Sequence, residues 1–130
     1  VAGMTKEIEA IYDNGVYLAG KSTQLLLSKE EIDLKYILAL INSKLLTFFF
    51  KKLFNSLSMS GGFFTIGKEQ LSNLPIRIDK NLEKYIQIVE RIIELKKLDK
   101  DTQDLENQID EMVYDLYELT EEEKKLVREF

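Results

Sequence analysis

The sequence lacks two side chains on which protein chemistry most often relies. Its 130 residues include no cysteine and no histidine. The first absence excludes disulfides, zinc–thiolate sites and thiol nucleophiles, and the second removes the commonest general base and the commonest transition-metal ligand. An enzyme built on this chain would have to use Asp, Glu, Lys or Tyr. We therefore expect the chain not to be a catalyst.

Long apolar stretches are also missing. The most hydrophobic run, LLTFFF at 45–50, is far shorter than the roughly 20 residues that a membrane-spanning helix needs, and the first residues show no signal-peptide order. Together with the lack of cysteine, this predicts a cytoplasmic protein with no membrane partner. Because the chain opens with Val1 instead of Met, we expect a fragment of a longer protein.

Acidic and basic residues are unevenly distributed along the chain. Residues 1–80 carry ten Lys/Arg against eight Asp/Glu, a net charge of +2, whereas residues 81–130 carry eight against fifteen, a net charge of −7. We therefore predict two regions, a mildly basic one over 1–80 and an acidic helical spacer or docking region over 81–130. A polyanion would bind the first region.

The pattern of residues 1–80 predicts a small, mostly antiparallel sheet packed on one central helix, an α+β fold. Apolar residues at three- and four-residue spacing indicate a helix over 33–56, preceded by a capping box at Ser28 and Glu31. DNG at 13–15 is a hairpin signal, and residues 67–73 read as a turn or one helical turn. The expected strands lie at 6–12, 16–18, 23–27, 63–66 and 74–78.

Two apolar stripes at helical spacing follow, over 82–93 and 105–116. They predict an antiparallel, coiled-coil-like helical pair, with one continuous rod as the alternative. Thr120 and Glu123 form a second capping box, which predicts a short last helix that ends near Glu129.

Residues 15–22 match the phosphate-binding loop pattern G-x-x-x-x-G-K-[ST]. Such a loop lies between a buried strand and a helix whose N-terminus holds the phosphates. Here the loop itself contains the strand-like VYLA, and TQLLL follows where a helix should begin. We therefore interpret the segment as a strand, a turn and a strand, without a nucleotide site.

A cluster of Lys, Ser, Asn and Gly residues is the strongest candidate for ligand binding. Lysines attract phosphate groups whatever the sequence of the nucleic acid that carries them. Ser and Asn add short hydrogen bonds, and paired glycines let the backbone approach a ligand closely. An ordinary charged helix face with a loop after it would have the same composition, so both interpretations stay open. The candidates are Lys21, Ser22, Thr23, Lys44, Lys51, Lys52, Asn55, Ser58, Ser60, Gly61, Gly62 and Lys68.

Three stretches in order resemble the TaqI-like C-terminal specificity domain. This is the target-recognition domain of type IIG restriction–modification enzymes and related adenine-N6 DNA methyltransferases. The stretches are LALINSKLLTFFFKK at 38–52, SGGFFTIGKEQLSNLPI at 60–76 and EMVYDLYELTEEEKKLV at 111–127. The likeness extends from about Tyr17 to the end of the chain. Glu118 departs from it, because Gly is expected there, and this predicts a smoother helix end without a glycine cap.

The resemblance implies a non-catalytic domain that recognises a sequence in double-stranded DNA. An N-terminal methyltransferase domain of the parent protein, accompanied by a nuclease in some relatives, would carry the chemistry. S-adenosylmethionine, with Mg²⁺ as a further candidate, would then bind the parent protein, and this chain would hold no cofactor or metal. The Asn-Pro-Pro-Tyr/Phe methyltransferase signature is indeed missing from the sequence.

The same resemblance implies how the two regions divide the work in a bacterial or archaeal cell. The basic region, 1–80, would be the DNA target-recognition domain and would meet the duplex. The acidic helices of 81–130 would point away from it and hold the neighbouring domain or, as a homodimer, a second copy. The matches at 42–44 and 74–76 would mark scaffold and not base readout. Two alternatives stay open: a fragment of a type I restriction specificity subunit, and a helical module for protein interaction or oligomerisation.

Overall fold

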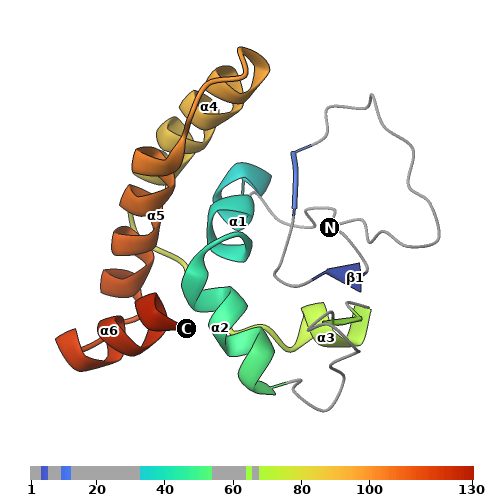
Figure 1. Cartoon of the computed structure of the whole chain (residues 1–130), viewed down its shortest axis with the longest axis vertical. Helices are drawn as coiled ribbons and strands as arrows, with labels where there is room; N and C mark the ends of the chain where they lie inside the picture. Colours follow the sequence, from blue (N-terminus) through green and yellow to red (C-terminus); the bar gives the residue numbers. More distant parts are fainter. Residues whose placement is uncertain (1–3, 6–9, 13–32, 54–63, 66–67) are drawn as a thin grey trace.

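The computed structural model describes residues 4–5, 10–12, 33–53, 64–65 and 68–130 of the chain. Helices dominate this part of the protein (Figure 1). The elements are β1 (Met4–Thr5), α1 (Leu34–Ile41), α2 (Lys44–Leu53), β2 (Phe64–Thr65), α3 (Lys68–Ser72), α4 (Glu83–Lys97), α5 (Gln103–Leu116) and α6 (Glu121–Glu129).

The predicted α+β fold is wrong for the described part of the chain, which is helical. Its β structure there amounts to one antiparallel pair of two-residue strands, in which Met4 faces Thr65 and Thr5 faces Phe64. Residues 10–12 and 74–78 were expected as strands, but neither segment joins a sheet. The expected features at 13–15, 16–18, 23–27 and 28–31 lie outside the described residues.

The single helix predicted over 33–56 is two helices in the structure. Asp33 begins α1 by accepting a hydrogen bond from the Lys35 backbone N–H at 2.7 Å. The break comes at Ser43, whose hydroxyl donates to the Leu40 carbonyl at 2.6 Å and accepts from the Leu46 N–H at 3.3 Å. A serine side chain that competes with the backbone in this way ends one helix and caps the next.

The predicted C-terminal helical pair is present as an antiparallel hairpin of α4 and α5, and the continuous-rod alternative is wrong (Figure 1). Asp99 sits in the turn with φ of 56°, in the left-handed region. The Lys100 N–H donates to the Leu95 carbonyl at 2.9 Å and the Asp99 N–H to the Lys96 carbonyl at 3.1 Å. This pair of bonds is a Schellman cap, which reverses the chain after α4.

Helix α5 ends in the same way, so the smoother end predicted from Glu118 is wrong. Glu118 has φ of 56°, and the Leu119 N–H donates to the Tyr114 carbonyl at 3.1 Å. The Glu118 N–H donates to the Asp115 carbonyl at 3.1 Å and completes the cap. A residue with a Cβ therefore occupies a conformation that suits glycine.

We expect Glu118→Gly to raise the free energy of unfolding by about 0.5–1 kcal/mol, because glycine has no Cβ to strain in the left-handed region. Glu118→Ala is the matched control, since it keeps the Cβ and removes only the exposed 3.5 Å ion pair with Arg77. That pair contributes at most about 0.5 kcal/mol. Urea denaturation followed by circular dichroism measures both variants. Equal stability of the Gly and Ala variants would contradict the prediction.

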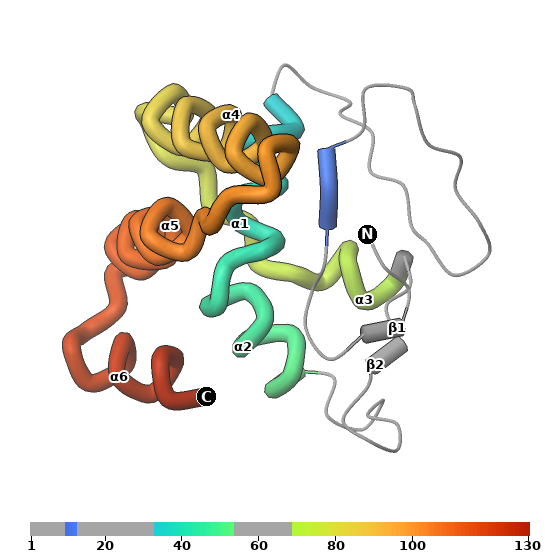
Figure 2. The backbone as a smooth tube through the Cα atoms, turned by 45° about the horizontal axis from the view of Figure 1, so that its top comes forward, coloured from blue at the N-terminus to red at the C-terminus, as the bar shows by residue number. Residues whose placement is uncertain are grey.

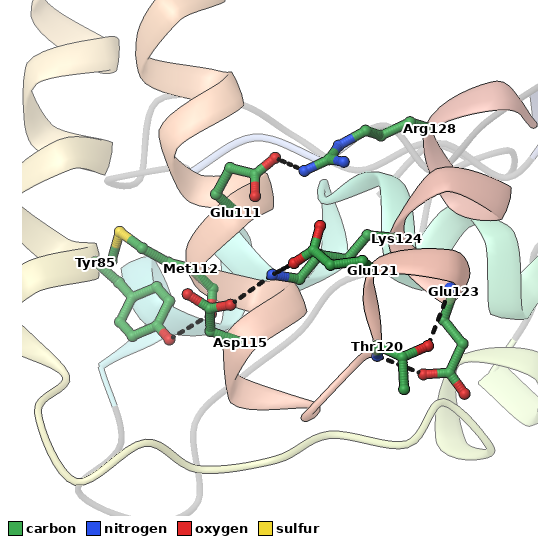
Figure 3. A network of polar contacts seen from close by, with 9 residues as sticks. All are labelled: Tyr85, Glu111, Met112, Asp115, Thr120, Glu121, Glu123, Lys124 and Arg128. Atoms are coloured by element: carbon green, nitrogen blue, oxygen red, sulfur yellow. Dashed lines mark hydrogen bonds and ion pairs between the residues drawn. The ribbon is translucent and has the colours of Figure 1, made fainter.

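The last helix, α6, begins at the predicted capping box and folds back onto α5 (Figure 3). Thr120 accepts from the Glu123 N–H at 3.2 Å, and the Glu123 carboxylate accepts from the Thr120 N–H at 2.8 Å. Lys124 donates to Asp115 on α5 at 3.0 Å, and further along α6 an arginine pairs with a glutamate of α5. These contacts direct the end of α6 toward α2.

One hydrophobic core joins the helices on both sides of residue 80. Helix α1 packs chiefly on α4, and α2 packs on α5 and α6 (Figure 2). The division at 80/81 stays a prediction, but the helices of the two regions share one interior. The buried core residues are Tyr36, Ala39, Leu40, Ile41, Leu45, Leu46, Phe50, Leu74, Tyr85, Val89, Ile109, Val113, Tyr114 and Val127.

Tyrosine hydroxyls, and not a neighbouring strand, hold the segment 75–79. The Tyr36 hydroxyl donates to the Arg77 carbonyl at 2.7 Å and accepts from the Asp79 N–H at 2.9 Å. The Tyr117 hydroxyl donates to the Pro75 carbonyl and accepts from the Arg77 N–H at 3.0 Å. The backbone of this segment is thus bonded by side chains and belongs to no sheet, and of its apolar residues Ile76 and Ile78 are 38 % and 50 % exposed, so the strand prediction for 74–78 is wrong.

The described helices are all too short or too polar to cross a bilayer.

Candidate functional site

Three of the candidate DNA-binding lysines lie on α2 and are described with their side chains. Lys44 begins the helix, and Lys51 and Lys52 lie in its last turn. Lys68 begins α3, where only its backbone is described. The remaining candidates lie outside the described residues: Lys21, Ser22, Thr23, Asn55, Ser58, Ser60, Gly61 and Gly62.

The Asn-Ser-Lys motif at 42–44 forms a structural junction. The Asn42 side-chain amide donates to the Ala10 carbonyl at 2.8 Å, and its oxygen accepts from the Ala10 N–H at 2.8 Å. Two residues later, the Lys44 N–H donates to the Asp110 carboxylate of α5 at 2.9 Å. The motif therefore connects three distant parts of the chain, which agrees with the scaffold role predicted for it.

Asp110 is 8 % exposed and acts as a cap for a helix other than its own. Burial raises the pKa of its carboxyl, and the hydrogen bond from the Lys44 N–H opposes that rise. A negative charge at the N-terminus of α2 also suits the dipole of that helix. The group has a structural partner and thus needs no catalytic explanation.

The same interior holds a buried tyrosine. Among the residues that the structure describes, none is a hydrogen-bond partner of the Tyr114 hydroxyl, and burial raises the pKa of Tyr114 to about 12. The ring faces the Arg128 guanidinium at 5.6 Å. Because a phenol with so high a pKa stays protonated and neutral near pH 7, it cannot act as a base there.

The C-terminal end of α2 brings two of the candidate lysines to one aromatic ring. The Lys51 ammonium nitrogen lies 5.5 Å from the centre of the Phe130 ring, and that of Lys52 lies 5.2 Å from it. Lys52 is also 5.7 Å from the ring of Phe48. Figures 1 and 2 show the C-terminus beside α2, in agreement with the packing of α6 on that helix.

This arrangement changes one expectation about the acidic region. Residues 81–130 were predicted to point away from the lysine-bearing surface, but the end of α6 reaches it. The sequence did not single out Phe130, because the contact depends on α6 folding back across α2. A sequence pattern could have indicated this contact only if Phe130 were close to Lys51 and Lys52 along the chain.

The described residues offer charge and hydrogen bonding at this surface, and no metal centre. No group of three or more Asp or Glu side chains in the described ranges is placed to hold a metal ion. Two ammonium groups over an exposed ring can attract an anion such as a phosphate. The surface is therefore suited to binding an anion.

A family model described as the TaqI-like C-terminal specificity domain matches residues 1–76. The first two stretches on which the resemblance rested lie inside that range, whereas the third, at 111–127, lies beyond it. No curated protein and no solved structure matches the chain. Since the family match extends over more than half of the 130 residues, the chain belongs to the family of TaqI-like C-terminal specificity domains.

Proposed function

We propose that this chain binds double-stranded DNA as the non-catalytic target-recognition part of a restriction–modification enzyme or adenine-specific DNA methyltransferase. The family match carries the proposal, because it spans residues 1–76 and these include all twelve candidate DNA-binding residues. The pair formed by Lys51 and Lys52 supports it from the structure. Helices α4, α5 and α6 form the scaffold that holds α1 and α2.

Phosphate contacts would supply most of the affinity, and base contacts the sequence preference. Because the whole chain carries a net charge of −5, we expect weak binding when it is alone. Binding would be much stronger beside the methyltransferase domain of the parent protein, which would bind S-adenosylmethionine and, where a nuclease is present, Mg²⁺. A type IIG parent is the proposal, with a type I specificity subunit as its alternative.

The alternative of a helical interaction module would use the apolar stripes of 82–116 as its working surface. The structure packs those stripes inward, since Ile109 is buried and Ile92 packs against the core. Little of that apolar area is left for a partner. We therefore propose DNA recognition and not homodimerisation through these helices.

A salt titration of duplex binding by the full chain tests the proposed function. We expect log K to fall linearly with log salt concentration between about 50 and 200 mM, with a slope of about −0.9 for each phosphate contacted. Fluorescence anisotropy of a labelled duplex of mixed sequence measures it. An unlabelled single strand and heparin serve as competitors. A chain that binds no duplex at about 50 mM salt would contradict the proposal.

A further inference from the structure

The pair of lysines at the end of α2 is held by a residue far away in the sequence. Lys51 and Lys52 are neighbours on the helix, and their ammonium nitrogens lie 5.5 and 5.2 Å from the centre of the Phe130 ring. A cation within about 6 Å of an aromatic centroid is attracted by the ring quadrupole. The single ring therefore draws together two like charges that would otherwise repel each other.

The Phe130 ring is anchored on one side and open on the other. It meets the Phe48 ring edge-on, with centroids 4.9 Å apart and an interplanar angle of 81°. Phe48 in turn packs against the hydrophobic core. Yet Phe130 is 55 % exposed, so the ring fixes the lysines at the surface and does not bury them.

The two ammonium groups have no acidic partner among the described side chains and can meet an external anion. In the described part of the chain, neither Lys51 nor Lys52 forms an ion pair with an acidic side chain. Lys124, by contrast, contacts both Asp115 and Glu121. The lysine pair thus has an aromatic support and no acidic side chain of the described residues as a counter-ion.

We propose that Phe130 is a positioning residue that holds the ammonium groups of Lys51 and Lys52 together as one binding site for the phosphates of a DNA backbone. This inference rests on the proposed function. It deepens that function by giving α6, the last acidic helix, a direct part in the DNA-binding surface. Preorganising the two side chains lowers the conformational entropy that binding would otherwise have to overcome.

Two substitutions of the same residue separate the ring's electrostatic effect from its apolar bulk. Phe130→Leu keeps an apolar side chain but has no quadrupole, whereas Phe130→Tyr keeps an aromatic face. We expect Phe130→Leu to weaken duplex binding about two- to fivefold and Phe130→Tyr to leave it unchanged. The salt slope should stay the same in both variants, because neither removes a positive charge.

Leu126→Ala is the control, since Leu126 is 63 % exposed on α6, one turn before Phe130, and makes no cation–ring contact. It should bind the duplex like the wild type. A second measurement needs no DNA: the ring current of Phe130 should shift the ε-methylene proton resonances of Lys51 and Lys52. In Phe130→Leu these shifts should disappear for Lys51 and decrease for Lys52, which also lies near the Phe48 ring, and in Phe130→Tyr they should persist for both.

These experiments distinguish a failure of the inference about Phe130 from a failure of the proposed function. If the wild type binds duplex and Phe130→Leu binds equally well, the inference is overturned while the proposed function stands. If the ring-current shifts are missing from the wild type, the geometry itself is refuted. If the wild type binds no duplex, the proposed function fails and the inference fails with it.

Discussion

Replacing both Lys51 and Lys52 with glutamate should lower the affinity for duplex DNA by at least about a hundredfold near 0.1 M salt. Each phosphate contact contributes about a factor of ten at this concentration, because each releases about 0.9 of a counter-ion. The salt slope should become less negative by about 2 for the same reason. Anisotropy titrations at several salt concentrations measure both quantities.

The chain offers a matched control for this charge reversal. Lys96 and Lys97 are also neighbouring lysines in the last turn of a helix, but they lie at the far end of α4 (Figure 1). Replacing both with glutamate changes the net charge of the chain by the same amount. We expect this control to alter the slope by much less than 1, because no phosphate contact is lost there. Equal losses in the two variants would show that only net charge matters and would refute the proposed surface.

Replacing Tyr85 with alanine should lower the free energy of unfolding by about 3–5 kcal/mol, the range for removing a buried aromatic side chain. Tyr85 is fully buried and meets the Tyr36 ring edge-on, with centroids 5.0 Å apart. Its hydroxyl donates to the Asp79 carboxylate at 2.8 Å. The substitution therefore removes both core packing and a support of the segment 75–79.

Two further variants divide this loss into its parts. Tyr85→Phe keeps the ring and removes the hydroxyl, so we expect a loss of about 1–2 kcal/mol from the missing hydrogen bond to the Asp79 carboxylate, which keeps Asn81 and Lys84 as partners. Tyr12→Ala is the control for the substitution itself, because Tyr12 is 41 % exposed and should cost at most about 0.5 kcal/mol. Urea unfolding followed by circular dichroism measures all three. A loss under about 1 kcal/mol for Tyr85→Ala would contradict the packing described here.

The Tyr85 hydroxyl also belongs to a charged group at the start of α4. The Asn81 N–H, the Tyr85 hydroxyl and Lys84 all stabilise the ionised Asp79 and hold the pKa of its carboxyl below the usual range. Burial raises the pKa of Tyr85 itself, and the neighbouring Asp79 adds to that rise. Tyr85 is consequently a neutral donor, which is the role that the hydrogen bond requires.

Sequence patterns located the helices well where apolar spacing and capping agree. The stripes of α4 and α5 and the Thr120–Glu123 capping box each depend on residues within a few turns of one another. Such local signals need no knowledge of the rest of the fold. The helix start near Asp33 and the short turn of α3 were found for the same reason.

Predictions from the sequence were wrong or incomplete where a residue's structural partner lies far along the chain. The stretch at 38–52 keeps its apolar period and has no Pro or Gly, so no local sequence pattern indicated the break at Ser43. Asn42 is held by Ala10, and the Lys44 N–H by Asp110, which are 32 and 66 positions away. The contact of Phe130 with Lys51 and Lys52 also joins residues that are far apart in the sequence.

The strand prediction for 74–78 failed for a different physical reason. The apolar alternation of Leu74, Ile76 and Ile78 is typical of a strand with one buried face, but Ile76 and Ile78 are 38 % and 50 % exposed. Here the hydroxyls of Tyr36 and Tyr117 take the places that a neighbouring strand would occupy. The family likeness was the more reliable guide, because it does not depend on naming each element correctly.

The junction at 42–44 limits how this recognition module could be transplanted into another enzyme. A chimera cut at residue 76, where the family match ends, would leave behind the α5 carboxylate on which the first turn of α2 depends. The graft would also expose the faces of α1 and α2 that pack on the hairpin. An exchange of specificity between relatives therefore has to carry the helices through α6 as one unit, or else redesign the start of α2.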